Sequence, residues 1–226
     1  MNKLLLTIMA SLLVLSAQAD MSVIPRISAE SQSYQTDFSS ADYVSFGAGI
    51  SFVAESKLYV DFEFFRNNGE DRIVGEVTRE ETTLTVGKAI SNGLSLFGGY
   101  KIARSVGVDE TNENANSSSL NEIELDTDGL FVGVSKTFSA GERGMFTLAA
   151  AVSPMNARVT TEDLQTGDDI VSEESATGVS LNVAYNHMLT NSLISSVGYK
   201  QQSFSYGGDI GSEEVSSLFA KLAYRF

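Results

Sequence analysis

The chain has no cysteine, one histidine, and only 15 basic residues against 29 acidic ones. Without cysteine it can form no disulfide, carry no thiol nucleophile and attach no lipid anchor through a thiol. A single histidine cannot supply the clustered imidazoles of a transition-metal site. The net charge of −14 disfavours nucleic acid, because the phosphate backbone would be repelled. We therefore expect no cofactor, no metal centre of this kind and no nucleic-acid partner.

Long apolar runs are also lacking, except at the start of the chain. Lys3, the run from Leu4 to Leu15 and the small-x-small motif Ala17-Gln18-Ala19 have the composition of a secretory signal peptide. The run is too short to span a bilayer as a helix. We expect residues 1–19 to be a signal peptide and residues 20–226 to form one domain. The mean hydropathy near zero excludes a helical membrane protein but allows a β-barrel, in which only every second residue faces lipid.

Instead of apolar runs, the sequence has an alternation with a period of two. Apolar side chains occupy the even positions from 58 to 64 and the odd positions from 179 to 185, with mostly polar residues between them. This period is typical of β-strands and not of helices. Ten segments show it, at 22–35, 41–54, 57–66, 79–90, 94–105, 126–138, 144–158, 176–189, 193–206 and 214–226.

The connections between these segments differ in length in a regular way. Short ones at 55–56, 91–93, 139–143 and 190–192 take turns with longer ones at 67–78, 106–125 and 159–175. A membrane barrel has short turns at one end and long loops at the other, whereas a soluble β-sandwich has no reason to place its long loops together. We predict an all-β fold, a closed antiparallel transmembrane β-barrel of about ten strands. Eight strands are the alternative, if the first or the sixth segment does not span.

The last nine residues carry a more specific signal. Leu222, Tyr224 and Phe226 share one face of a strand, and Lys221 and Arg225 share the other. A final strand that ends in two spaced aromatic residues resembles the closing strand of bacterial outer-membrane β-barrels, the group that includes the OmpA-like transmembrane domain and the opacity porins. The resemblance implies export to the outer membrane of a Gram-negative cell, contact with lipid and lipopolysaccharide, and recognition of Phe226 and Tyr224 by the barrel-assembly machinery. Those relatives have eight strands, which is where this sequence departs from them.

Extending the alternation assigns a direction to the charged side chains. Lys88, Lys136 and His187 are predicted to point outward near the periplasmic end. The charges predicted to face the lumen are Arg26, Glu30, Asp61, Glu63, Lys101, Lys200, Lys221 and Arg225, together with the aromatic residues Tyr59, Phe65, Phe97, Phe131 and Phe219. Because closure places the first strand beside the last, we expect Arg26 and Glu30 to reach Lys221 or Arg225. Such a lumen is either a packed polar plug or the selective lining of a narrow channel.

Acidic residues are concentrated in two of the long connections. Residues 106–129 contain seven and residues 159–176 contain six, with no lysine or arginine in either stretch. We expect solvated, acidic extracellular loops, with divalent cations as possible partners beside lipopolysaccharide. Glu124-x-Asp126-x-Asp128-Gly129 resembles the opening of an EF-hand loop, but Ser135 stands at the twelfth position, where that motif requires glutamate.

The single histidine bears on whether the chain is an enzyme. Barrel enzymes of the outer membrane use a histidine near the outer rim or facing lipid, with serine and carboxylate partners. His187 is predicted at the periplasmic end, and its neighbours Asn186 and Ser192 provide no carboxylate to orient it. We expect a non-enzymatic outer-membrane protein that is structural or presents acidic loops. A narrow porin-like channel is the alternative, and a lipid A-modifying or proteolytic enzyme is the least favoured hypothesis.

Overall fold

The computed structural model describes residues 21–36, 40–71, 75–109, 121–163, 168–207 and 211–226, and it consists of β-strands joined by turns. The strands are β1 (Met21–Thr36), β2 (Ser40–Ala54), β3 (Leu58–Asp71), β4 (Gly75–Ser91), β5 (Leu94–Asp109), β6 (Asn121–Ala140), β7 (Gly144–Asp163), β8 (Asp168–Met188), β9 (Leu193–Tyr206) and β10 (Ser212–Tyr224). Within these ranges, no helix has the length and apolarity needed to cross a membrane. The predicted signal peptide lies outside the described residues.

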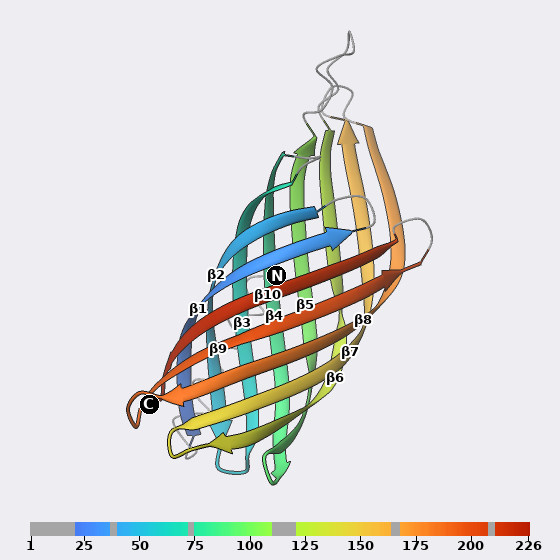
Figure 1. The fold of residues 1–226 in the computed structure, drawn as a ribbon. Helices are drawn as coiled ribbons and strands as arrows, with labels where there is room; N and C mark the ends of the chain where they lie inside the picture. Colours follow the sequence, from blue (N-terminus) through green and yellow to red (C-terminus); the bar gives the residue numbers. More distant parts are fainter. Residues whose placement is uncertain (1–20, 37–39, 72–74, 110–120, 164–167, 208–210) are drawn as a thin grey trace.

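Each strand pairs antiparallel with its neighbours in sequence, and β1 also pairs with β10, which closes the sheet. The prediction of a closed antiparallel barrel is therefore confirmed. Ten strands are present and not eight, because the first and sixth predicted segments form β1 and β6. Figure 1 shows the strands tilted around the barrel, with the C-terminus at the end that carries the tight turns.

The strand register fixes the tilt of the barrel. Starting at Ser22 on β1, the directly paired residues can be followed through every strand until the path returns to β1 at Tyr34. The path returns twelve residues further along the same strand (34 minus 22). Strand number and stagger together determine the tilt and diameter of a barrel, and a barrel near this size has an interior mostly filled by side chains.

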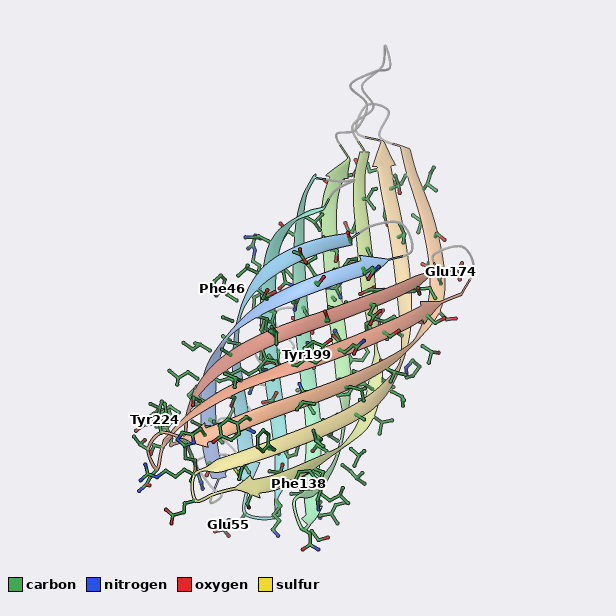
Figure 2. All side chains as sticks on the ribbon, in the orientation of Figure 1. Phe46, Glu55, Phe138, Glu174, Tyr199 and Tyr224 are labelled. Atoms are coloured by element: carbon green, nitrogen blue, oxygen red, sulfur yellow. The ribbon has the colours of Figure 1, made fainter. Side chains whose placement is uncertain are left out.

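The two faces of the sheet differ in the way that the alternation predicts. Large apolar side chains are exposed on the outside and form an apolar belt, with Phe46 at 68% and Leu130 at 63% exposure. Aromatic residues lie at the lower edge of the belt, where Phe138 and Tyr224 are seen in Figure 2. The described lumen face is lined by buried polar, charged and aromatic side chains. An apolar outside around a polar inside is the reverse of a soluble protein and suits a bilayer.

The strands at the upper end are longer than the sequence analysis predicted. Residues 67–71, 75–78, 159–163 and 168–175 are strand, so the expectation that 67–78 and 159–175 are mainly loops is wrong. In the third connection, 106–125, residues 106–109 and 121–125 are strand as well, and the rest lies outside the described residues. The acidic residues Glu124, Glu162 and Glu173 consequently lie on strands. The backbone of this upper sheet is hydrogen-bonded strand to strand, which the acidic composition alone does not prevent because the charges face water.

The upper rim has a step at one place. β8 pairs with β9 only as far as Ala176 and Tyr206, with one further hydrogen bond from the Gly207 N–H to the Ser175 oxygen at 2.9 Å. β8 continues outward to Asp168, paired with β7. Figure 1 shows β8 rising well above the end of β9. Residues 168–175 of β8 thus lie above its last register pair with β9, and the rim rises as a spiral from β9 round to β8.

Candidate functional site

The lower part of the lumen contains an ion-pair cluster on β1, β3 and β10. The Arg26 guanidinium donates two hydrogen bonds to Asp61, at 2.5 and 2.7 Å, and its Nε donates to Glu63 at 3.2 Å. Lys221 donates to the same Glu63 oxygen at 2.7 Å. The bidentate pair fixes the arginine in orientation, because two parallel bonds leave the guanidinium no freedom to turn.

A second cluster lies at the middle of the lumen. Lys101 Nζ is 2.8 Å from Glu81 and also donates to Gln202 at 3.3 Å. Lys200 Nζ lies 4.0 Å from the other oxygen of Glu81. Lys101 comes from β5, Glu81 from β4 and Lys200 from β9, which is five strands away from β4 in either direction round the barrel. Glu81 therefore joins opposite walls of the lumen.

A third cluster fills the upper lumen. Arg79 Nη2 lies 3.7 Å from Glu213, which is 2% exposed and also accepts a hydrogen bond from the Tyr206 hydroxyl. The Arg79 guanidinium stands 5.7 Å from the centroid of the Tyr34 ring, and that ring meets Tyr43 edge-on at 6.1 Å. A charge this deeply buried is tolerated only with partners of opposite charge and hydrogen bonds.

Among the described residues, the charged side chains of these three clusters, together with Glu30, balance. Arg26, Arg79, Lys101, Lys200 and Lys221 face an equal number of acids, Glu30, Asp61, Glu63, Glu81 and Glu213. Between the middle and lower clusters remains a cavity of about 240 Å³, whose lining includes Glu63, Glu81, Lys101 and Lys200. The lining combines charged and small polar groups with alanines and the rings of Phe97 and Phe131, and its polar groups allow the cavity to hold water or a small polar solute.

Inward aromatic side chains lie against glycines of the neighbouring strand. Seven aromatic residues sit directly opposite a glycine in the register, namely Tyr43 and Gly69, Tyr59 and Gly87, Phe65 and Gly47, Phe97 and Gly133, Phe131 and Gly99, Phe204 and Gly178, and Phe219 and Gly198. A Cβ atom at Gly69 would lie 2.1 Å from the Tyr43 ring. The glycines therefore let the rings lie flat on the wall and leave the centre of the lumen to the ion pairs.

Seven of the eight charges predicted for the lumen lie on the lumen side of the sheet, all except Arg225, and two details differ from the expectation. Arg225 lies beyond the end of β10, is exposed, and donates from Nε to the Ser22 hydroxyl at 3.2 Å, so it is not a lumen residue. Glu30 does not reach Lys221 or Arg225; it accepts a hydrogen bond from Gln32 at 3.0 Å. Lys221 lies beside Ser28 in the register, next to Glu30, but its amine extends across the lumen to Glu63 on β3 instead.

Sequence reasoning missed the partners that complete the network. Glu81 and Arg79 lie in the fourth predicted segment, on the face opposite Leu84 and Val86, and extending the alternation would have placed them in the lumen. Glu213 lies one residue before the tenth predicted segment, so its location depended on the strand boundary.

The outer face of the upper sheet carries exposed charge. Arg104 Nη2 is 2.6 Å from Glu124, and the Tyr100 hydroxyl donates to Asp128. Glu124, Asp126 and Asp128 follow one face of β6 in an extended backbone. The resemblance to an EF-hand opening is therefore not matched by structure, because that motif folds its ligands around one point.

His187 lies where the alternation predicted it, on the outside near the lower turns. Its Nδ1 is 3.3 Å from the Tyr185 hydroxyl, and the two rings stack at 6.1 Å. Tyr185 also contacts Phe146 at 4.9 Å. The histidine belongs to the aromatic edge of the belt, and its interactions in the described part of the chain include no carboxylate.

The two terminal aromatic residues are on the outside as well. Tyr224 and Phe226 are 46% and 76% exposed, and their rings meet at 4.8 Å. The Phe226 N–H donates to the Val23 oxygen at 3.0 Å, which continues the pairing of β10 with β1 past the last strand residue.

Comparisons with known proteins support the fold and go no further. No family model and no curated protein sequence matches the chain. Among solved structures it is similar to the β domain of the Bordetella autotransporter BrkA, at a TM-score of 0.59 and 12% identity over 91% of this chain and 100% of that one. It is also similar to the outer membrane protease OmpT of Escherichia coli, at 0.58 and 11% over 91% and 96% of the chains. The chain thus has the fold of small outer-membrane β-barrels.

Proposed function

We propose that the chain is a non-enzymatic integral outer-membrane protein of a Gram-negative bacterium, with a plugged lumen and an acidic upper sheet presented at the cell surface. The apolar belt, bounded below by aromatic residues and above by charged ones, supports the membrane placement. The tight turns and the C-terminus then lie in the periplasm, and the step in the rim lies outside. The exposed Tyr224 and Phe226 suit recognition by the assembly machinery.

The proposal that the lumen is plugged depends mainly on the charge balance across it. Glu81 holds lysines from opposite walls, and Arg79 and Glu213 come from strands on different sides of the barrel. A channel that selects ions through charged side chains uses rings of one charge sign along its path. Among the charges of the three clusters each sign is matched, and Glu81 extends between lysines of opposite walls.

A narrow channel is the second candidate, favoured by the cavity of about 240 Å³ beside Lys101 and Lys200. Single-channel conductance in a planar bilayer separates the two. If the lumen is plugged, we expect no steady conductance from the inserted protein at low or high salt. Steady conductance whose ion selectivity changes when Lys101, Lys200 or Lys221 is neutralised would replace the plug by the channel.

The absence of cysteine makes the orientation directly testable. Ser172→Cys on β8 should react with a membrane-impermeant maleimide on intact cells, whereas Glu55→Cys in the turn after β2 should react only after the outer membrane is opened. The reverse pattern would overturn the proposed orientation. Labelling of neither residue in cells that carry the folded protein would overturn the surface presentation.

The upper sheet supports contact with lipopolysaccharide. Arg104 and Arg158 stand among Glu80, Asp126 and Asp128 on the outer face above the belt, around a groove of about 770 Å³. The arginines suit phosphate groups, and the carboxylates suit divalent cations that bridge to further phosphates. Within the part of the chain that the structure describes, His187 contacts the Tyr185 hydroxyl and no carboxylate, which supports a non-enzymatic role.

A further inference from the structure

We propose that the free edge of β8, residues 169–174, takes up an extended cationic peptide segment of another protein as an additional antiparallel strand. The inference rests on the proposed function, because the edge must be outside the cell to meet such a partner. It adds the class of partner and the way in which it binds.

The backbone of β8 is prepared for a neighbour. The Ser175 oxygen accepts the hydrogen bond from Gly207, so the main-chain groups of Ser175 point to the β9 side. Since these groups alternate in direction along a strand, Asp169, Val171 and Glu173 point to that side too. Within the described residues, no strand lies against β8 there beyond Ser175. A row of unpaired N–H and C=O groups is a template for strand addition.

Two apolar side chains support the same conclusion independently. Ile170 is 74% exposed and Val171 is 45% exposed, one on each face of β8. Both lie above the apolar belt, on the part of β8 that the proposed orientation places outside the membrane. An added strand would place its own side chains beside Ile170 on one face and beside Val171 on the other, and so remove apolar surface from water.

The charges select the kind of partner. The edge carries Asp169, Glu173 and Glu174, and in the register Glu162 on β7 lies opposite Asp169. Arg158, opposite Glu173, is the one cation at these positions. A second copy of the chain would bring the same acids against them, and like charges at close range oppose pairing. Acidic side chains thus block self-association at this edge but attract a basic strand.

The test uses the full barrel in lipid nanodiscs and a fluorescent eight-residue peptide of alternating lysine and valine. Binding is followed by anisotropy at two salt concentrations, and the Val171 and Glu173 amides by hydrogen exchange. We expect binding that weakens with salt, protection of both amides by the peptide, and no binding of a glutamate–valine peptide. Val171→Pro removes one edge N–H without a change of charge and should weaken binding at least about fivefold.

Matched variants separate strand addition from simple charge attraction. Val171→Thr keeps the N–H and should bind within about twofold of the parent. Asp169→Asn should weaken binding, whereas Asp42→Asn, an exposed acid on β2 away from the step, should not. Equal binding by Val171→Pro and Val171→Thr, unprotected amides, or no binding would overturn the proposal. A dimer that forms without peptide and is disrupted by Val171→Pro would also overturn the proposal, because the β8 edge would then pair with a second copy of the chain. The cysteine labelling of intact cells tests surface presentation separately.

Discussion

At the scale of single residues, the centre of the lumen depends on Glu81. It is 11% exposed and is the acid that Lys101 and Lys200 share. Glu81→Gln would remove the acid that these two buried ammonium groups share, and breaking a buried pair in this way costs about 3–5 kcal/mol. We expect a large fall in the urea midpoint of the barrel folded in detergent.

The neighbouring residue provides the control. Glu80 faces outward, and its partner Arg66, 3.7 Å away, is 61% exposed. Glu80→Gln should change the free energy of unfolding by less than about 0.5 kcal/mol. Similar losses for the two variants would mean that the lumen network does not stabilise the barrel.

The glycine–aromatic pairs make a second prediction at this scale. A methyl group at Gly69 would overlap the ring of Tyr43, which is 5% exposed and held between Tyr34 and Val77. Gly69→Ala should therefore cost about 1–3 kcal/mol in unfolding free energy. At Gly87 the overlap is with Tyr59, which is only partly buried and can swing into the lumen, so Gly87→Ala should cost less. An equal cost at both positions would contradict this account.

At the scale of the strand, β8 should show an alternating pattern of amide exchange when no peptide is bound. The Ile170, Ser172 and Glu174 amides face β7 and should exchange slowly, while those of Asp169, Val171 and Glu173 face the free edge and should exchange fast. Uniformly fast exchange across 169–174 would show that this stretch is not a stable strand in solution. Uniformly slow exchange would show that the edge is already covered.

The strands were predictable wherever one face meets lipid, because the apolar belt imposes a period of two on the sequence. Above the belt no face of the sheet meets lipid, so this constraint on the sequence ends. The acidic composition of these stretches led to the prediction of loops. The period is nevertheless present there: Ile123 and Leu125 alternate with Glu124 and Asp126. The lumen charges followed from the same alternation, but their pairing did not. Pairing depends on the stagger, a property of all ten strands that no local pattern contains.

At the scale of the whole molecule, the C-terminal residue should affect assembly more than stability. Phe226 is 76% exposed, and its N–H bond to Val23 uses only the backbone. Phe226→Ala should lower the amount of barrel in the outer membrane while leaving the urea midpoint of refolded protein unchanged within about 0.5 kcal/mol.

Phe138→Ala, at another position of the aromatic edge, serves as the control and should assemble normally. Normal assembly of the Phe226→Ala variant would contradict the proposal that Phe226 is a recognition signal for barrel assembly. A large loss of stability would show that the side chain contributes to the fold.

The spiral rim also fixes the direction in which an added strand would run. β8 runs from the tip of the sheet toward the mouth of the barrel, so an antiparallel neighbour must run the opposite way, as β9 does. A segment seated there has its N-terminal end beside Gly207 at the mouth and its C-terminal end pointing away from the cell. In a longer partner, the residues before the segment would therefore lie near the mouth of the barrel, and the residues after it would lie away from the cell surface. Because β8 extends beyond β9, the barrel would hold an added strand at one place on its rim and in one direction.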